Sequence, residues 1–289
     1  MYRIGILQLT QNLDDAVRGF KQGLNDAGIS AEFHYLNADG NLAELPKLAE
    51  ELAGLEVDLI FACSTPAAKA AAGLAAPIPV VFTPVFDPVG AGLVRSMSKP
   101  GGKATGMAGM VKAAAKVEFI QQLLPAAQKI GILYHTTDAN SLLETENFRT
   151  AAAGFFELTE LPVHTPEELS LLENILPPGL DGLFIPIGRV IEENFASIVY
   201  YTDARSLPII ASHAPNVPAG ALGALTANHQ SLGRACSAQA VQILQGASPA
   251  AIPVGIVENP EILLNQFSAD SLGIELPAVL LAAAQEVYE

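Results

Sequence analysis

Short apolar runs rich in valine, isoleucine and phenylalanine alternate along this chain with alanine-rich segments of helical periodicity. Strands that are apolar throughout and separated by helices are typical of a parallel sheet covered by helices on both faces. The elements expected first are a strand at 3–9, a helix at 13–27, a strand at 31–36, a helix at 42–53, a strand at 57–63, a helix from Pro66 and a strand at 79–85. The sequence therefore predicts an α/β fold.

The pattern restarts at KIGILYH (129–135), which echoes RIGILQL (3–9) near the front of the chain. The elements expected after it are a helix at 141–154, a strand at 155–161, a helix opened by the capping box Thr165-Pro166-Glu167-Glu168, a strand at 182–187, a helix to Arg205 and a strand at 207–212. This repeat predicts two doubly wound parallel-sheet lobes in tandem, the first ending near Met110.

The residues after 220 are too few for a third lobe, so we expect them to return to the first two. Lobe 1 is predicted to hold 1–110 and about 228–252, and lobe 2 to hold 111–227 and about 258–289. The chain then crosses between the lobes three times, which predicts a hinge.

Composition and charge exclude several classes of protein. With 289 residues, of which 50% are hydrophobic, the chain can bury a large core, and no apolar run approaches the roughly 20 residues that span a bilayer. The net charge of −15 repels phosphate backbones, so nucleic acid is not an expected partner. Cys63 and Cys236 lack C-x-x-C spacing and the five histidines form no H-E-x-x-H pair, so we expect buried cysteines, no metal and no cofactor.

Polar side chains recur where the predicted strands end, which is where open α/β sheets bind ligands. The candidate ligand-binding residues there are Gln8, Ser64, Thr65, Phe86, Asp87, His135, Arg189 and His213. No G-x-S-x-G elbow, P-loop or paired-carboxylate motif accompanies them, and the glycines near Gly90 do not complete G-x-G-x-x-G. The residues therefore favour a binding protein over an enzyme.

Several of these residues have a second interpretation. Thr65 opens an alanine-rich helix, so its hydroxyl either caps that helix or contacts a ligand. Asp87 precedes Pro88, which is typical of a helix start with the carboxylate as N-cap. Phe86 is either a wall of the site or part of the core. Arg189 is either a clamp for an anion or a surface residue that begins the next helix.

Six segments together resemble one family: GILQ (5–8), STPAAKAAAG (64–73), TPVFDPVGAGLV (83–94), ILYHTTDANS (132–141), PAGALGAL (218–225) and ADSLGI (269–274). Over essentially its full length the chain resembles ABC-transporter substrate-binding proteins of the tryptophan/tyrosine type. The resemblance implies a type I periplasmic-binding-protein fold whose two lobes close over a small ligand, either amino-acid-like or an aromatic or anionic carboxylate. It also implies ligand contacts from Ser64, Thr65, Asp87, Asn140 and Ser141.

The resemblance further implies an exported, lipid-anchored protein, here expected to be a monomer, that delivers ligand to a membrane permease and its ATPase. Met1 leads directly into a strand, so we expect either a cytoplasmic protein or a mature form that lacks its targeting segment. Two alternatives are a ligand-sensing regulator core of the same fold, for which we expect no room ahead of the first strand for a helix-turn-helix, and a small-molecule α/β enzyme.

Three positions depart from the family pattern where relatives often carry acidic residues. This chain has Gly109 after the first crossing, Gly188-Arg189 after the strand at 182–187, and Ser212-His213-Ala214 after the strand at 207–212. Because arginine suits bidentate recognition of carboxylate, these departures favour an anionic ligand that does not need a free α-ammonium group.

Overall fold

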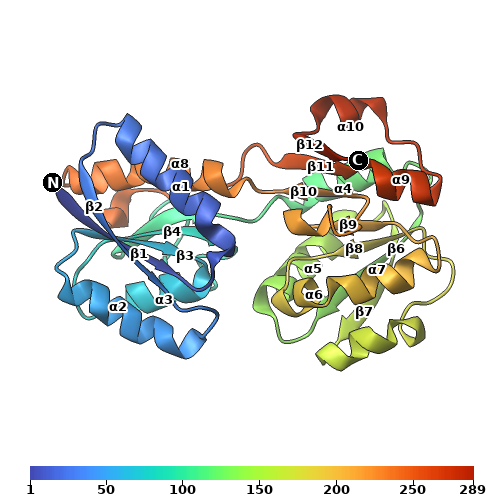
Figure 1. Ribbon diagram of the computed structural model, residues 1–289, viewed down its shortest axis with the longest axis horizontal. Coiled ribbons are helices and arrows are strands. Elements are labelled where there is room, and N and C mark those ends of the chain that lie inside the picture. Colours follow the sequence, from blue (N-terminus) through green and yellow to red (C-terminus); the bar gives the residue numbers. More distant parts are fainter. The chain divides into compact units, whose positions relative to one another are not determined.

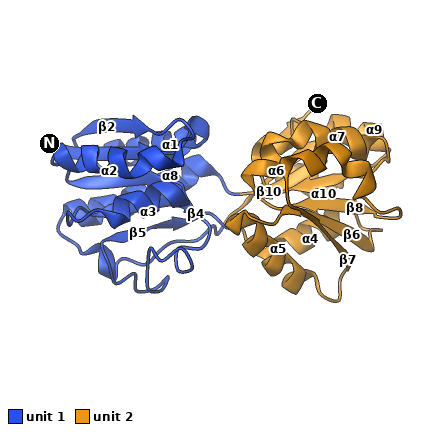
Figure 2. Cartoon of the chain, turned by 90° about the horizontal axis from the view of Figure 1, so that it is seen from below, with its two compact units in different colours: residues 1–110, 227–258 blue, residues 111–226, 259–289 orange.

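The computed structural model describes all 289 residues, which form two compact units. Unit 1 comprises residues 1–110 and 227–258, and unit 2 comprises residues 111–226 and 259–289 (Figure 2). The chain therefore passes from one unit to the other three times, after Met110, after Thr226 and after Glu258.

Unit 1 is built on a five-stranded, entirely parallel sheet with the order β2-β1-β3-β4-β5 (Figure 1). Its strands are β1 (Tyr2–Gln8), β2 (Ala31–Asn37), β3 (Leu59–Cys63), β4 (Val80–Val85) and β5 (Ala104–Ala108). Its helices are α1 (Asp14–Asp26), α2 (Leu45–Gly54), α3 (Thr65–Gly73) and α8 (His229–Leu244). From β1 the chain order runs to β2 on one side, and from β3 it runs to β4 and β5 on the other side. The carboxyl ends of β1 and β3 therefore lie at the topological switch point, where sheets of this kind bind ligands.

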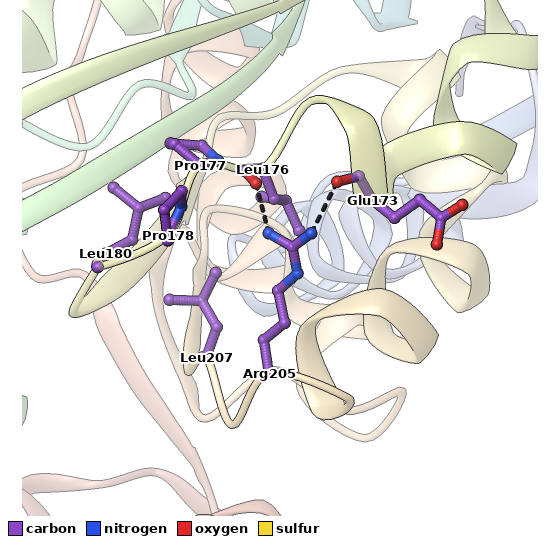
Figure 3. Close-up of a pocket in the computed structure, with 8 residues that line it drawn as sticks. Glu173, Leu176, Pro177, Pro178, Leu180, Arg205 and Leu207 are labelled. Atoms are coloured by element: carbon purple, nitrogen blue, oxygen red, sulfur yellow. Dashed lines mark hydrogen bonds between the residues drawn. The ribbon is translucent and has the colours of Figure 1, made fainter.

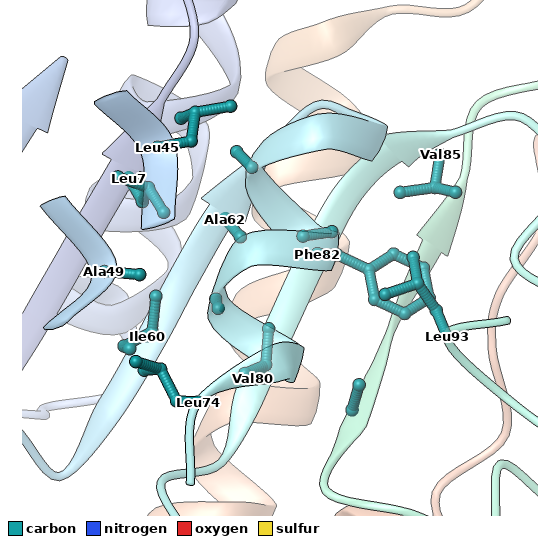
Figure 4. Packing of buried hydrophobic residues seen from close by; sticks show 14 of the residues in the cluster. Leu7, Leu45, Ala49, Ile60, Ala62, Leu74, Val80, Phe82, Val85 and Leu93 are labelled. Atoms are coloured by element: carbon teal, nitrogen blue, oxygen red, sulfur yellow. The ribbon is translucent and has the colours of Figure 1, made fainter. Parts of the chain in front are cut away.

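Helices cover both faces of this sheet, as the apolar strands predicted. One core cluster packs Leu7, Ile60 and Phe82 against α2 and α3 (Figure 4). The other packs Ile6 and Phe61 against α1 and α8. Cys63 and Cys236 are buried and unpaired within the second cluster, which confirms that both are core residues.

Glycines bring α1 and α8 into backbone contact. A Cβ atom on Gly19 would lie 1.9 Å from the carbonyl oxygen of Gln230, and one on Gly233 would lie 1.9 Å from that of Ala16. Only residues without a side chain allow two helices to approach this closely. These glycines therefore dock the returning segment 227–258 onto unit 1.

Unit 2 has a seven-stranded sheet with the order β12-β11-β10-β9-β8-β6-β7. Its strands are β6 (Lys129–His135), β7 (Glu157–Val163), β8 (Gly182–Ile185), β9 (Ile209–Ala211), β10 (Gly223–Thr226), β11 (Glu261–Asn265) and β12 (Glu286–Tyr288). Its helices are α4 (Ala113–Leu123), α5 (Ala139–Ala152), α6 (Arg189–Glu193), α7 (Phe195–Asp203), α9 (Gln266–Leu272) and α10 (Ala278–Ala283).

The sheet of unit 2 is parallel, as predicted, except toward its β12 end, where β11 runs antiparallel to β10. Strand β10 ends where the chain leaves for unit 1 after Thr226, and β11 begins just after the chain returns at Asn259. Strand β10 therefore runs toward the chain crossings, and β11 runs away from them. Strand β12 then pairs with β11 in parallel.

The capping box at Thr165 does not form as predicted. Pro166–Asn174 is a 3-10 helix with a kink at Leu171, and the Thr165 side chain caps nothing. Glu168 instead accepts from the residue before the cap position, since the backbone N–H of His164 donates to its Oε2 at 2.7 Å. The helix expected after β8 is also divided, because non-helical backbone at Asn194 separates α6 from α7.

Candidate functional site

Gln8 ends β1 at the switch point of unit 1, and its side chain is fully buried. Its Oε1 accepts a hydrogen bond of 2.7 Å from the hydroxyl of Tyr35, whereas its Nε2 has no partner. A buried donor without a partner is uncommon in folded proteins. The Tyr35 contact was not predicted, because Tyr35 lies on β2 and only the register of the two strands places it beside Gln8.

Ser64 links β3 to α3 in a strained conformation, with φ at +92°. Such a backbone costs on the order of 1–3 kcal/mol for a residue other than glycine, and strain of this kind gathers at functional sites. Oγ of Ser64 accepts from the backbone N–H of Ala67 at 3.5 Å, so Ser64 and not Thr65 is the N-cap. The Thr65 hydroxyl, which is half-buried at the first helical position, makes no cap.

Asp87 follows β4 and caps a turn rather than a helix, which corrects the predicted helix start. Its Oδ1 accepts from the backbone N–H of Val89 at 3.1 Å and of Gly90 at 2.8 Å. The chain cannot continue as a helix because Gly92 adopts a left-handed φ of +74°. The second oxygen of Asp87 accepts no hydrogen bond from the chain, and Phe86 beside it is half-buried. Asp87 is therefore a turn cap with one oxygen left over.

Asp138 joins two strand ends of unit 2 and was not among the predicted residues. Its Oδ1 caps α5 by accepting from the backbone N–H groups of Asn140 and Ser141 at 2.9 and 3.2 Å. Its Oδ2 accepts from the backbone N–H of Arg189 at 3.2 Å. The D-A-N-S sequence carries an N-cap signal that could have identified it.

Two predicted residues of this edge are fully enclosed. Ser141 is buried and its Oγ accepts from the backbone N–H of His135 at 3.4 Å. His135 is also buried, with Nδ1 at 3.1 Å from Oγ1 of Thr137 and with Nε2 lacking a partner. Asn140 is half-buried at the start of α5. Of these three side chains, Asn140 is the one that is partly exposed.

Arg189 begins α6 as a surface residue. Its side chain is 60% exposed, and its Nε lies 3.2 Å from Oε1 of Glu193 one turn along the same helix. In this structure the guanidinium of Arg189 therefore lies on the surface beside an acidic partner of its own helix.

Glu192 and His213 meet at the ends of β8 and β9. Oε1 of Glu192 accepts from the backbone N–H of Gly188 at 3.1 Å, and Oε2 lies 3.7 Å from Nδ1 of His213. Burial raises the pKa of Glu192 to about 7 and lowers the pKa of His213 to about 4. Asp138 and Glu192 therefore supply acidic side chains at this edge, although the positions that depart from the family pattern carry none.

A buried ion pair lies at the same edge of unit 2 and was not predicted. The ammonium of Lys116 on α4 contacts Oε1 of Glu144 on α5. The hydroxyl of Ser212 joins both groups, since it accepts from the Lys116 ammonium at 2.7 Å and donates to Oε1 of Glu144 at 2.7 Å. Oε2 of Glu144 accepts from the backbone N–H of Ile187 at 2.7 Å. No local pattern reveals such a pair, because its members are 28 residues apart.

A pocket of about 600 Å³ lies at the opposite edge of the unit 2 sheet (Figure 3). It is lined by residues that precede β8 and β9, among them Leu180 and Leu207. The guanidinium of Arg205 is held there by the carbonyl oxygens of Leu176 and Glu173. None of the predicted ligand-binding residues lies in this pocket, and no group of three or more His, Cys, Asp or Glu residues in the structure could hold a metal ion.

Comparison with known proteins identifies close relatives. A family model described as ABC transporter substrate binding protein matches residues 3–288. A tyrosine-binding protein of Clostridioides difficile (strain R20291) is 31% identical over 279 residues, covering 94% of this chain and 81% of that protein. An ABC domain from Streptococcus pneumoniae in complex with L-Trp is 29% identical, with a TM-score of 0.87 and 99% of both chains covered. The ligand-free, open structure of a substrate-binding protein with adhesive properties from Clostridium difficile is 29% identical, with a TM-score of 0.87, covering 100% of this chain and 99% of that chain.

Proposed function

This chain belongs to the family of ABC transporter substrate-binding proteins, and from that membership we propose that its ligand is an aromatic amino acid. Its two α/β units have the fold of type I periplasmic binding proteins. One observation carries the proposal. Two relatives that align with nearly the whole chain, at 31% and 29% identity, are a tyrosine-binding protein and a protein in complex with L-Trp.

The strand-end residues offer a partner for each part of such a ligand. The first-turn N–H groups of α3, with the hydroxyl of Thr65, suit the carboxylate, because a helix N-terminus favours anions. Each unit has one acidic group that suits the α-ammonium, which needs an acidic partner once it leaves water: the free oxygen of Asp87 in unit 1, or the carboxyl of Glu192 in unit 2. Phe86 supplies an aromatic surface for the side chain.

Arg189 and Asn140 take modest roles in this proposal. We assign no anion clamp to Arg189, because its guanidinium is exposed and paired with Glu193. Asn140 offers an amide to the ligand from the start of α5. The buried side chains of Gln8, His135 and Ser141 support the strand ends of their own units. A ligand with both a carboxylate and an ammonium therefore fits better than a purely anionic one.

The family consists of binding proteins that serve ABC transporters outside the cytoplasm. We propose that this chain binds without catalytic turnover, acts as a monomer, and hands its ligand to a permease driven by an ATPase. No helix of the structure is long and apolar enough to cross a membrane. We propose a lipid anchor on a longer precursor as its means of attachment.

Calorimetry and thermal shift with L-tryptophan, L-tyrosine, L-phenylalanine and 3-(indol-3-yl)propanoate test the proposal. A ligand at about 100 times its Kd should stabilise the protein by roughly 2.7 kcal/mol. We expect L-tryptophan or L-tyrosine to bind and the desamino compound to bind at least about tenfold more weakly, because it leaves an acidic residue without its partner. Absence of binding by all three amino acids would contradict the proposal. Equal binding of the desamino compound would restore the anionic ligand.

A further inference from the structure

Glu144 and Lys116 are the most deeply buried ion pair of the protein, with exposed fractions of 2% and 4%. Lys116 also lies against the ring of Phe184, with Nζ 5.8 Å from the ring centroid. Two well-packed apolar side chains often stabilise a protein as well as a buried ion pair does. Stability alone therefore does not account for charges at these two positions.

What distinguishes this pair is the set of groups that Glu144 holds. Its Oε2 accepts from the backbone N–H of Ile187, in the loop that connects β8 to α6. Its Oε1 accepts from the hydroxyl of Ser212, in the segment that follows β9. One carboxylate on α5 thus ties together two loops at the carboxyl edge of the sheet, and each loop leads directly into a residue of the candidate site, Glu192 or His213.

Lys116 has a separate part in this arrangement. Asp138 and Glu192 already place negative charge at the same edge, and a further unpaired carboxylate there would oppose both. The ammonium of Lys116 neutralises Glu144 and donates to Ser212 at 2.7 Å. Since α4 begins at the third residue of unit 2, this bond also ties the first helix after the crossing to the two loops.

We propose that Glu144 is a positioning residue for the ligand site of unit 2, holding the loops at Ile187 and Ser212 in their binding geometry. This role rests on the function proposed above. Glu144 does not touch the ligand, because its carboxylate is enclosed and occupied by Lys116, Ser212 and Ile187.

Two double variants separate positioning from stability. In Lys116→Met/Glu144→Gln, the neutral amide still accepts from Ile187 and donates to Ser212, and no charge is left unpaired. In Lys116→Met/Glu144→Leu, the charges are also gone, but both loops lose their hydrogen-bond partner. By calorimetry with L-tryptophan or L-tyrosine, whichever binds, we expect the first variant to keep its Kd within about threefold and the second to weaken about tenfold to a hundredfold.

Hydrogen exchange supplies a readout that needs no ligand. In the leucine variant, amides at 187–189 and 212–214 should exchange about tenfold faster than in the glutamine variant, whereas the core strands should not differ. The matched control is Glu146→Leu/Arg149→Met, which removes an ion pair on the surface of the same helix, with side chains 59% and 51% exposed. This control should change neither measurement.

Equal exchange at both loops in the two double variants would overturn the proposal, and so would equal affinity. If the wild-type protein binds none of the amino acids, the proposed function fails. The exchange comparison still decides whether Glu144 holds the loops.

Discussion

Oε2 of Glu192 lies 3.7 Å from Nδ1 of His213 at the carboxyl edge of the unit 2 sheet. Burial shifts the two groups in opposite directions, raising the pKa of Glu192 to about 7 and lowering that of His213 to about 4. Asp138, Glu144 and Glu193 add to the rise for Glu192, and the N–H of Gly188 opposes it. At neutral pH the imidazole is uncharged, and burial favours the protonated form of the carboxyl.

These shifts give opposing contributions to stability. Between its usual pKa of 4.5 and about 7, Glu192 holds a proton in the folded state that the unfolded state releases, so its contribution to stability falls as pH rises. Between 6.5 and about 4, unfolded His213 takes up a proton that the folded state does not bind, so its contribution is lost as pH falls. The two contributions offset each other over most of this range.

Removing one of the two side chains should reveal the pH-dependent contribution of the other to stability. Relative to wild type, Glu192→Gln should become more stable, with its free energy of unfolding larger by on the order of 1–3 kcal/mol, as pH rises from 4.5 to 7. Relative to wild type, His213→Gln should become less stable as pH rises from 4 to 6.5. Urea unfolding at several pH values measures both differences. If neither difference depended on pH, the burial of this pair would have no effect on its titration.

The contact of α1 with α8 predicts a large effect from a single methyl group. Gly19→Ala places Cβ within 1.9 Å of the carbonyl oxygen of Gln230, so the helices must separate. We expect a loss of about 1–3 kcal/mol, measured by urea unfolding. Gly54→Ala is the matched control, because no atom lies within 4 Å of its added Cβ. It should leave stability unchanged or raise it by up to about 1 kcal/mol. Equal unfolding midpoints for the two variants would contradict the tight helix contact.

Two substitutions of Asp87 should separate its role as a turn cap from its proposed contact with the ligand. Asp87→Asn keeps an oxygen for the N–H groups of Val89 and Gly90, so stability should change by less than about 0.5 kcal/mol. Asp87→Ala removes this cap and should cost about 1 kcal/mol. If the second oxygen contacts a ligand ammonium, both variants should bind L-tryptophan about tenfold more weakly. A loss of stability in Asp87→Ala, with affinity unchanged in both variants, would reduce Asp87 to a turn cap.

The sequence predicted much of the architecture because the pattern of apolar residues is local. Continuous apolar strands such as β3, with every residue buried, require helices on both faces of the sheet. The restart at Lys129 indicated a second α/β repeat for the same reason. The capping box at Thr165 failed even though its residues are adjacent, because the kink at Leu171 and the 3-10 geometry there depend on packing.

The sequence by itself determined most of the strands and helices between residues 3 and 212, and it determined that polar residues follow the strands. Only the tertiary structure decided which of those residues meet. Asp138 reaches the backbone of Arg189 across 51 positions, and Glu144 reaches Ser212 across 68. The direction of β11 was likewise set by the return of the chain to unit 2. Periodicity reports the burial of one residue at a time, whereas these contacts depend on strand order and loop course, which no local pattern encodes.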